Sequence, residues 1–290
     1  MVRAARGRPG SLAGHTGRAT LPGMSHTGRG VLVTGASRGV GAATARAFAA
    51  RGDRVVVHYR GARERAEAVL AGLDGEGHAL LGADLADPTQ VQRLAADAAS
   101  ALGRVDVLVN NAAMYVDAPV AGSRRVGHPL AETPYEEWVD VWARTLATNL
   151  LGPANLTWCV ARQMIEVPPA DGRPVGRIVN VGSRGAFRGE PDVPAYGASK
   201  AGLHAMGSSL AVALGSHGIG VVTLAPGFIA SEMAAPLLEG PGGDAVRGQS
   251  PFGRVASPQE VAQALCALAE PSAEWASGAV IDFNGASYLH

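Results

Sequence analysis

Residues 30–41, GVLVTGASRGVG, decide the fold of this chain. An apolar run typical of a buried strand leads directly into a turn with glycines at positions 35, 39 and 41, and a helical pattern follows at once. Glycines at such a turn let backbone N–H groups approach a pyrophosphate at the positive end of the helix. The stretch therefore predicts a dinucleotide-binding site at the head of a β-α-β unit; the alternative is a turn that only packs the helix on the strand.

Beyond this stretch, short apolar runs alternate with longer helical patterns. We expect strands at residues 30–34, 54–59, 78–82, 105–110, 177–182, 220–225 and 279–283. We expect helices at residues 40–51, 63–73, 88–102, 134–165, 196–217 and 258–269. This alternation predicts an α/β fold with a doubly wound, seven-stranded parallel sheet flanked by helices. No repeat or linker divides residues 30–290, which indicates a single domain.

Residues 1–29 differ from the rest of the chain. They contain five arginines, no acidic residue and many small residues, without hydrophobic periodicity. Such a segment buries too little apolar surface to order itself, so we expect a disordered tail. An Arg-rich, acid-free start is also compatible with an organelle transit peptide, but its glycines and prolines break any amphipathic helix.

The composition indicates a globular protein without an obvious charged partner. Of 290 residues, 47% are apolar and 17% are charged, and the formal net charge is zero, so nothing points to nucleic acid or an anionic membrane. No apolar run is long enough for a transmembrane helix and the start lacks the apolar core of a secretory signal, so we expect a cytoplasmic protein. Cys159 and Cys266 lie in apolar helical patterns and predict buried thiols, and we expect no metal site.

The glycine spacing resembles that of one family. Thr34 followed by Gly-x3-Gly-x-Gly is similar to the TGxxxGxG loop of the short-chain dehydrogenase/reductase family, and the resemblance extends over residues 30–285. It implies a Rossmann-type catalytic domain similar to that of 3-oxoacyl-[acyl-carrier-protein] reductases. Further matches are Asp84-Leu85, at the adenine, Asn110-Asn111-Ala112-Ala113, which resembles an NNAG-type motif, and Pro226-Gly227-Phe228-Ile229-Ala230-Ser231, the segment that closes over the nicotinamide.

The end of the second predicted strand indicates which nucleotide binds. A ribose 2′-OH is normally held by an acid there, whereas a 2′-phosphate needs cations. The strand ends Val57-His58-Tyr59-Arg60 without an acid, and Arg38 stands in the glycine loop. Two guanidinium groups can bind a phosphate, so we expect NADP(H) rather than NAD(H), unless each arginine is only a solvated surface charge. The expected cofactor contacts are Gly35, Ser37, Arg38, Gly39, Val40, Gly41, Tyr59, Arg60, Asp84, Leu85, Asn111, Ala112, Tyr196, Lys200, Pro226, Gly227, Ile229 and Ser231.

Tyr196 and Lys200 lie one turn apart on a predicted helix, so both side chains project from one face. Lys200 is the only lysine of the chain. An ordinary amphipathic pair is the default interpretation of this spacing. Ser183, however, follows the fifth predicted strand, and Asn149 lies in the preceding helix where the family pattern has an asparagine. The resemblance implies that these four residues are catalytic.

The four residue types suit the reduction of a carbonyl group. Hydride transfer from nicotinamide C4 builds negative charge on the carbonyl oxygen, which must receive a proton. Tyr196 is the expected general acid/base, and we expect the Lys200 ammonium, aided by the positively charged oxidised nicotinamide, to lower its pKa. Ser183 is expected to hydrogen-bond the substrate oxygen. The resemblance implies that Asn149 holds a water that links Lys200 to solvent.

The sequence indicates the substrate less clearly than the cofactor and the catalytic residues. Long loops at residues 114–133, 184–193 and 227–253 are expected to form the substrate pocket. Candidate lining residues are Met114, Tyr115, Phe187, Met233, Leu237 and Phe252, each of which is alternatively a core or loop-packing residue. A positive cluster in the first loop either meets an anionic substrate or is solvated, and consists of Arg124, Arg125 and His128.

Three functions compete. The first is an NADP(H)-dependent oxidoreductase acting on a small-molecule carbonyl or secondary alcohol, for example a 3-oxoacyl thioester. The second is a nucleotide-sugar epimerase, which would show a different glycine spacing and a larger C-terminal region. The third is a non-catalytic NADP(H)-binding sensor, which would be expected to lose some of the four catalytic residues. The resemblance also implies a homotetramer or homodimer packed through the helices that start at Pro134 and Tyr196.

Overall fold

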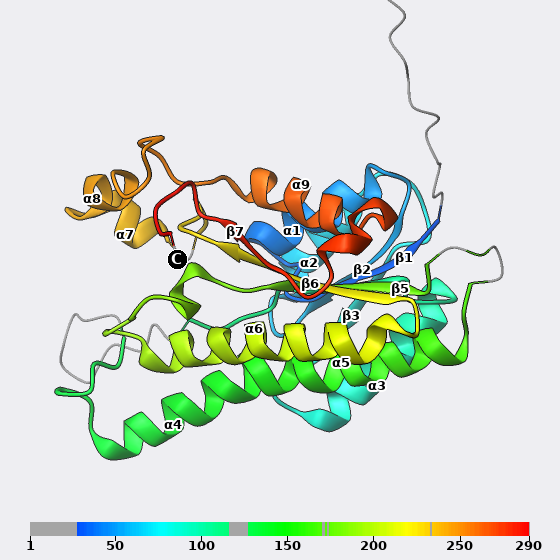
Figure 1. Cartoon of the computed structure of the whole chain (residues 1–290), viewed down its shortest axis with the longest axis horizontal. Coiled ribbons are helices and arrows are strands. Elements are labelled where there is room, and N and C mark those ends of the chain that lie inside the picture. Colours follow the sequence, from blue (N-terminus) through cyan, green and yellow to red (C-terminus); the bar gives the residue numbers. More distant parts are fainter. Residues whose placement is uncertain (1–27, 116–126, 170–171, 173, 233, 290) are drawn as a thin grey trace, which may run out of the picture.

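Seven parallel strands form one sheet in the part of the chain that the computed structural model describes, namely residues 28–115, 127–169, 172, 174–232 and 234–289 (Figure 1). Their order is β3-β2-β1-β4-β5-β6-β7, which confirms the predicted doubly wound α/β fold. The order reverses between β1 and β4, where ligands bind beyond the carboxyl ends of the strands. The strands are β1 (Gly30–Val33), β2 (Arg54–Tyr59), β3 (Ala79–Gly82), β4 (Val107–Asn110), β5 (Gly176–Val181), β6 (Ile219–Pro226) and β7 (Val280–Phe283).

Helices cover both faces of the sheet (Figure 1). One face carries α1 (Gly39–Ala49), α2 (Arg63–Ala71) and α9 (Pro258–Leu268). The other face carries α3 (Pro88–Leu102), α4 (Tyr135–Leu146), α5 (Gly152–Glu166) and α6 (Pro194–Gly215). Two short helices, α7 (Ala235–Glu239) and α8 (Gly243–Arg247), lie beyond the carboxyl ends of the strands.

The central strands are buried on both faces. In β1, Val31 and Val33 belong to the core cluster beneath α1 and α9, whereas Leu32 belongs to the cluster beneath α3 and α5. Side chains alternate between the faces of a strand, so a strand covered on both faces must be apolar throughout. This explains why β1 reads as a continuous apolar run in the sequence.

The helix predicted at residues 134–165 is not continuous. It consists of α4, a π-helical turn η1 (Ala147–Leu151) and α5. A π turn inserts one extra residue per turn, and such turns occur frequently at functional sites. Hydrophobic periodicity does not reveal a single inserted residue, because both flanking helices keep their own regular patterns. Further departures are the two helices α7 and α8 within residues 227–253, which the sequence predicts as a loop.

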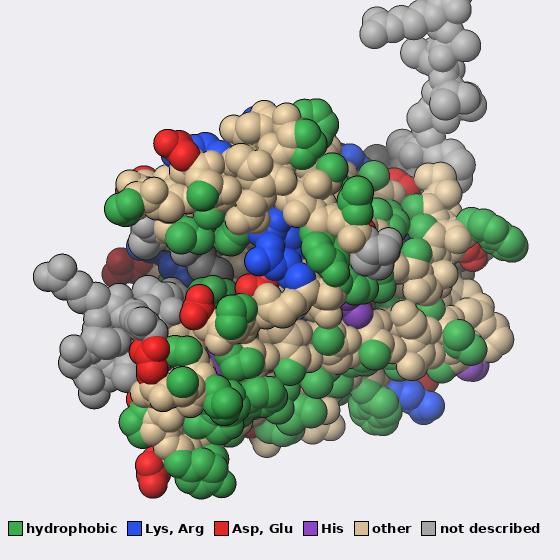
Figure 2. Space-filling model, turned by 60° about the vertical axis from the view of Figure 1, so that its left-hand side comes forward, with side chains coloured by type: hydrophobic (Ala, Val, Ile, Leu, Met, Phe, Trp, Pro, Cys, Tyr) green, Lys and Arg blue, Asp and Glu red, His purple; other side chains and the backbone are tan. Residues whose placement is uncertain are grey.

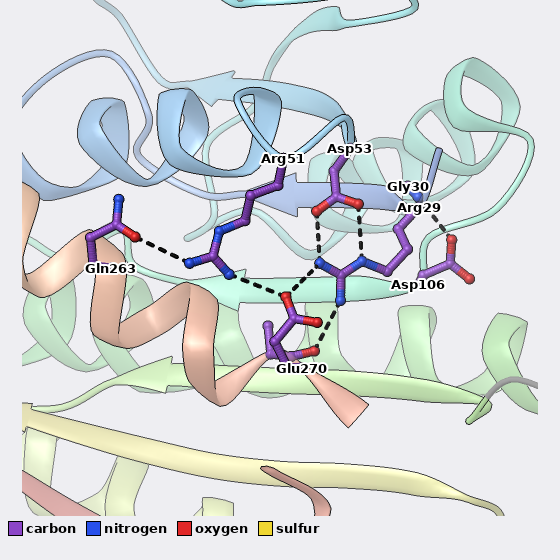
Figure 3. Close-up of polar contacts among 8 residues, drawn as sticks. Arg29, Gly30, Arg51, Asp53, Asp106, Gln263 and Glu270 are labelled. Carbon is purple, nitrogen blue, oxygen red and sulfur yellow. Dashed lines mark hydrogen bonds and ion pairs between the residues drawn. The ribbon is translucent and has the colours of Figure 1, made fainter. Parts of the chain in front are cut away.

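The ordered domain begins before the predicted boundary at residue 29. Arg29 is 6% exposed, and its guanidinium donates two hydrogen bonds to the Asp53 carboxylate at 2.8 and 3.0 Å (Figure 3). It also pairs with Glu270 at 3.1 Å, and Glu270 in turn pairs with Arg51 at 3.2 Å. The predicted tail was therefore too long at its end, because an ion pair fixes Arg29 at the amino end of the sheet. The predicted disorder of residues 1–27 lies outside the described residues.

Candidate active site

The glycine loop between β1 and α1 is shaped to accept a phosphate group. Helix α1 begins after Arg38 without a side-chain cap, so backbone N–H groups of its first turn are not satisfied by a capping side chain. Gly39 has φ +54°, and a Cβ placed there would have only the Ser231 Cβ, at 4.0 Å, within 4 Å. At Gly35 a Cβ would lie 2.9 Å from the Ala112 Cα, so packing excludes a side chain. The loop is thus tightly packed on the sheet side and open above the helix, which fits a dinucleotide pyrophosphate.

The loop is held from behind by Asn111, predicted as a cofactor contact. Its side-chain amide donates hydrogen bonds to the backbone carbonyls of Thr34 and Gly35 at 2.8 and 3.2 Å. The backbone N–H groups of Asn111 and Ala112 both donate to the Thr34 hydroxyl at 3.0 Å. The side chain of Asn111 therefore supports the glycine loop, and Thr34 joins the loop to the end of β4.

Buried His58 on β2 also supports the glycine loop, and the sequence analysis gave it no role. Its Nδ1 accepts a hydrogen bond from the Gly35 N–H at 3.1 Å, and its Nε2 lies 3.1 Å from the carbonyl oxygen of Ala83. This arrangement requires a neutral ring with its proton on Nε2. Burial accordingly lowers the pKa of His58 to about 4. A histidine inside an otherwise apolar strand, VVVHY, was the signal available in the sequence.

We expect acid to destabilise the fold through His58. The unfolded chain binds this proton near pH 6.5 and the folded chain only near pH 4, so stability is lost as pH falls through this window. The shift corresponds to about 3 kcal/mol. Urea unfolding at pH 7.5 and pH 4.5 measures it, with His58→Gln as the test variant and exposed His217→Gln as the control. A pH dependence equal in wild type and His58→Gln would contradict this assignment.

The four predicted catalytic residues come together beyond β4 and β5. Ser183 follows β5, and Tyr196 stands in the first turns of α6, where the serine hydroxyl acts to lower the tyrosine pKa. Lys200 is 2% exposed, donates to the carbonyl of Val181 at 2.8 Å, and its Nζ lies 5.8 Å from the centre of the Tyr196 ring. The side-chain amide of Asn149, in the π turn, donates a hydrogen bond at 3.2 Å to the hydroxyl of Ser199, which is on α6 like Tyr196 and Lys200.

Burial dominates the acid–base properties of Tyr196 and Lys200. Burial raises the pKa of Tyr196; the hydrogen bond with Ser183 lowers it, and the negative charge of Glu190 raises it further. Burial also lowers the pKa of Lys200 to about 8. Burial is therefore the largest influence on the tyrosine in this structure. The expectation that the Lys200 ammonium, aided by the oxidised nicotinamide, lowers this pKa stays a prediction. Glu190 was missed because it lies in a loop without a regular pattern.

The side chain of Asn149 is fully engaged with its neighbours. Its Nδ2 donates to the Met114 carbonyl at 2.9 Å and its Oδ1 accepts from the Met114 N–H at 2.8 Å. These bonds fix the segment that follows β4 against the π turn. The predicted water-holding role of Asn149 stays a prediction, and its side chain serves first to position Met114.

The remaining predicted cofactor contacts lie along the same edge of the sheet. The Asp84 carboxylate accepts from the Ala86 N–H at 2.9 Å, and Leu85 is buried against Gly152. The Tyr59 ring packs over Gly82, whereas Arg60 is exposed. The other predicted contacts are found in the glycine loop, in the first turn of α1, or at and after the end of β6, and comprise Ser37, Val40, Gly41, Pro226, Gly227, Ile229 and Ser231.

The predicted substrate-lining residues do not form one pocket. The Tyr115 ring lies edge-on to Tyr196 with centroids 5.1 Å apart, and Phe187 packs against His204. Phe252 instead lines a separate cavity of about 470 Å³ between Arg184 and the C-terminal segment. Leu237 is exposed and Met233 lies outside the described residues. On the face that brings the carboxyl ends of the strands forward, basic side chains lie in a central recess bordered by hydrophobic and acidic ones (Figure 2).

The predicted positive cluster includes a residue that is not at the surface. His128 is 1% exposed, and its Nε2 accepts a hydrogen bond from the Ala195 N–H at 3.2 Å. Burial lowers its pKa, so the neutral ring holds the start of α6. Arg124 and Arg125 lie outside the described residues.

The prediction of buried thiols is confirmed for Cys266 but not for Cys159, which is only half-buried. Cys266 is buried in the core beneath α9, and burial raises its pKa to about 12. Burial also raises the pKa of half-buried Cys159. Within the described residues, no helix is long and apolar enough to cross a membrane, and no group of three or more His, Cys, Asp or Glu residues is arranged to hold a metal.

Known proteins resemble this chain over most of its length. The family model for short chain dehydrogenases matches residues 29–242. D-threitol dehydrogenase from Mycolicibacterium smegmatis is 36% identical over 260 residues, which cover 89% of this chain and 92% of that protein. The 3-oxoacyl-[acyl-carrier-protein] reductase FabG from Escherichia coli K12 is 33% identical, over 92% of this chain and all of that protein. A short chain dehydrogenase from Burkholderia cenocepacia solved in complex with NADP superposes with a TM-score of 0.76 at 30% identity, over 90% and 98% of the two chains.

Proposed function

The chain belongs to the short-chain dehydrogenase family, and from this premise we propose that it is an NADP(H)-dependent oxidoreductase acting on a carbonyl or secondary alcohol. The observation that carries the proposal is that Tyr196 lies with its ring 5.8 Å from the Nζ of buried Lys200, on the helix that follows Ser183, near the open glycine loop. A non-catalytic nucleotide-binding protein has no need to hold a tyrosine, a serine and a lysine together in this way. The proposed activity supplies a role for each of them.

Each of these side chains has a definite task in carbonyl reduction. A bound NADPH would supply the hydride. The raised pKa of Tyr196 keeps its hydroxyl protonated, ready to donate to the carbonyl oxygen as charge develops there. Ser183 would donate a second hydrogen bond to the same oxygen and stabilise that charge. Lys200, with its pKa near 8, remains largely protonated at neutral pH and can replace the proton that Tyr196 gives up.

The same geometry serves alcohol oxidation in reverse. Tyr196 then accepts the proton of the alcohol, and Lys200 and the oxidised, positively charged nicotinamide both favour the phenolate. The lysine is suited to this task because it can lose and regain a proton, whereas an arginine stays protonated. The direction that the protein uses depends on the substrate. The names of its relatives suggest two classes, polyols and 3-oxoacyl thioesters.

The preference for NADP(H) rests on charge. Strand β2 ends at Tyr59 without an acidic residue, and Arg38 stands at the start of α1 above the crevice. The NADP bound to the Burkholderia relative supports the same choice. We further propose that the protein acts in the cytoplasm on small molecules, without a nucleic-acid or membrane partner.

A surface on α4 and α5 supports the proposed oligomer. Tyr135, Val139, Leu151 and Trp158 are each between 48% and 75% exposed on or between these helices. Exposed apolar side chains gathered on neighbouring helices are typical of subunit contacts. We therefore propose a homodimer or homotetramer that buries this surface, and multi-angle light scattering measures its mass directly. A monomer at micromolar concentration would rule this assembly out.

A cofactor-coupled assay tests the proposed function. NADPH absorbance is followed against ketones, 3-oxoacyl thioesters, quinones and ketoses, and NADP⁺ reduction against polyols such as D-threitol. We expect turnover on at least one class, with higher kcat/KM for NADP(H) than for NAD(H). Tight NADPH binding without turnover on any class would favour the non-catalytic sensor, whereas equal efficiency with both cofactors would contradict the charge argument at Arg38.

A further inference from the structure

Glu232 lies in the segment between β6 and α7 and pairs with two arginines from the β1–α1 loop and α2. It follows Ser231 in the segment after β6, yet its carboxylate meets two arginines from the other side of the crevice. Arg65 Nη1, from the first turn of α2, lies 2.7 Å from Glu232 Oε2. Arg38 Nη1, from the glycine loop, lies 3.5 Å from the same oxygen.

Two guanidinium groups that converge on one oxygen form the arrangement that a phosphate requires. Arginine binds phosphate and carboxylate with the same planar set of donors. In this structure the anion between Arg38 and Arg65 is a carboxylate of the protein itself. The two arginines lower the pKa of Glu232, Arg65 contributing more than Arg38, so the carboxylate is ionised at neutral pH.

The site is accessible to a ligand. The side chains of Arg38, Arg65 and Glu232 are between 55% and 59% exposed. Exposed ion pairs contribute little net stability, so a dianionic phosphate can displace the carboxylate at small cost. Arg60, which was predicted to share the phosphate with Arg38, makes no ion pair within the described residues, while Arg65 already points at the shared anion.

We propose that Glu232 occupies the position of the cofactor 2′-phosphate between Arg38 and Arg65, and that it limits the preference for NADP(H) because the phosphate must displace it. Arg65 is then a specificity-determining residue that the sequence did not indicate. This inference rests on the NADP(H) preference proposed above. NAD(H) has no phosphate at this position, so Glu232 can keep its ion pairs when NAD(H) binds.

Dissociation constants measured with the full chain test the proposal without any substrate. NADPH and NADH are titrated by fluorescence, and 2′,5′-ADP and 5′-AMP by calorimetry, because these fragments lack the nicotinamide. For Glu232→Gln we expect NADPH and 2′,5′-ADP to bind about 3- to 10-fold more tightly, since a negative charge a few ångströms from the phosphate is removed. The NADH and 5′-AMP constants should change less than twofold or weaken. The gain should shrink in 1 M salt.

Arg65→Met gives the opposite expectation and has a matched control. It should weaken 2′,5′-ADP binding about 5- to 20-fold while leaving 5′-AMP unchanged, because a charge-assisted contact to phosphate is lost. Arg63→Met removes a neighbouring arginine of α2 that pairs with Glu67, and should change neither constant. Glu239→Gln removes an exposed acid from α7 and controls for net charge.

The binding constants distinguish a failure of the proposal for Glu232 and Arg65 from a failure of the proposed NADP(H) preference. Weaker or unchanged NADPH binding by Glu232→Gln would overturn the proposal, as would an equal gain for NADPH and NADH, which would place the effect on the segment after β6 instead of the phosphate. If Arg65→Met and Arg63→Met weakened 2′,5′-ADP equally, Arg65 would have no specific role. Wild-type protein that binds NADH as tightly as NADPH would instead contradict the proposed cofactor itself.

Discussion

Tyr196→Phe lowers kcat by about 10²- to 10⁴-fold, the range that a positioned general acid contributes. The substitution removes only the phenolic oxygen. The ring keeps its edge-on contact with Tyr115 and its place beneath Lys200, so the fold should not change. The loss should appear in kcat and kcat/KM alike, because the proton is transferred in the transition state. The measurement uses whichever substrate gives turnover in the cofactor-coupled assay.

A second tyrosine controls for the chemistry of the substitution. Tyr135→Phe removes the same oxygen from a side chain that is 75% exposed on α4, away from Ser183. It should retain wild-type kcat. If Tyr196→Phe kept more than about a tenth of the wild-type rate, another group would have to supply the proton. The buried Lys200 would then be the next candidate, because its pKa lies near 8.

Arg29→Met lowers the free energy of unfolding by about 3–5 kcal/mol, the effect of breaking a buried ion pair by removing one partner. The Asp53 side chain is 1% exposed and would remain in the interior without the guanidinium that now donates two hydrogen bonds to it. Burial already raises the pKa of Asp53 even with Arg29 present, which shows how costly its charge is there. Urea or thermal unfolding measures the loss.

An exposed ion pair and a double variant serve as controls for the loss of the buried Arg29–Asp53 pair. Arg63→Met breaks an exposed pair with Glu67 and should cost no more than about 1 kcal/mol. The double variant Arg29→Met/Asp53→Leu removes both charges and should recover much of the loss, because well-packed apolar replacements of a buried pair are often neutral. Cofactor affinity should stay unchanged, since the pair lies at the amino end of the sheet. An Arg29→Met protein within 1 kcal/mol of wild type would contradict the prediction, because it would show that the buried Asp53 needs no cationic partner.

The sequence predicted the elements whose patterns are local. Each predicted strand corresponds to an observed one, because a strand covered on both faces must be apolar along its length. The positions of Ser183, Tyr196 and Lys200 followed from one strand end and one helical turn. Their assembly follows from the parallel sheet, which brings the strand ends to one edge.

The features that the sequence did not predict depend on contacts between distant residues or on a single inserted residue. The π turn that holds Asn149 leaves the flanking apolar patterns intact. The contact of Glu232 with Arg65 joins residues 167 positions apart, and no periodicity encodes it. In the sequence, Arg29 cannot be told from the other arginines of the predicted tail. Its ion pairs with Asp53 and Glu270, which are distant in the sequence, show that it belongs to the folded domain. The support that His58 gives to the glycine loop likewise depends on hydrogen bonds to the backbone of Gly35 and Ala83 in two other segments.

The burial of Lys200 has a practical consequence for labelling. Lys200 is the only lysine among the 290 residues, so it is their only side-chain primary amine. With its Nζ bound to Val181 and its side chain 2% exposed, Lys200 is shielded from acylating reagents in the native state. An amine-reactive dye should therefore leave Lys200 unmodified in the native protein, and modification of Lys200 would report that the structure around helix α6 has opened.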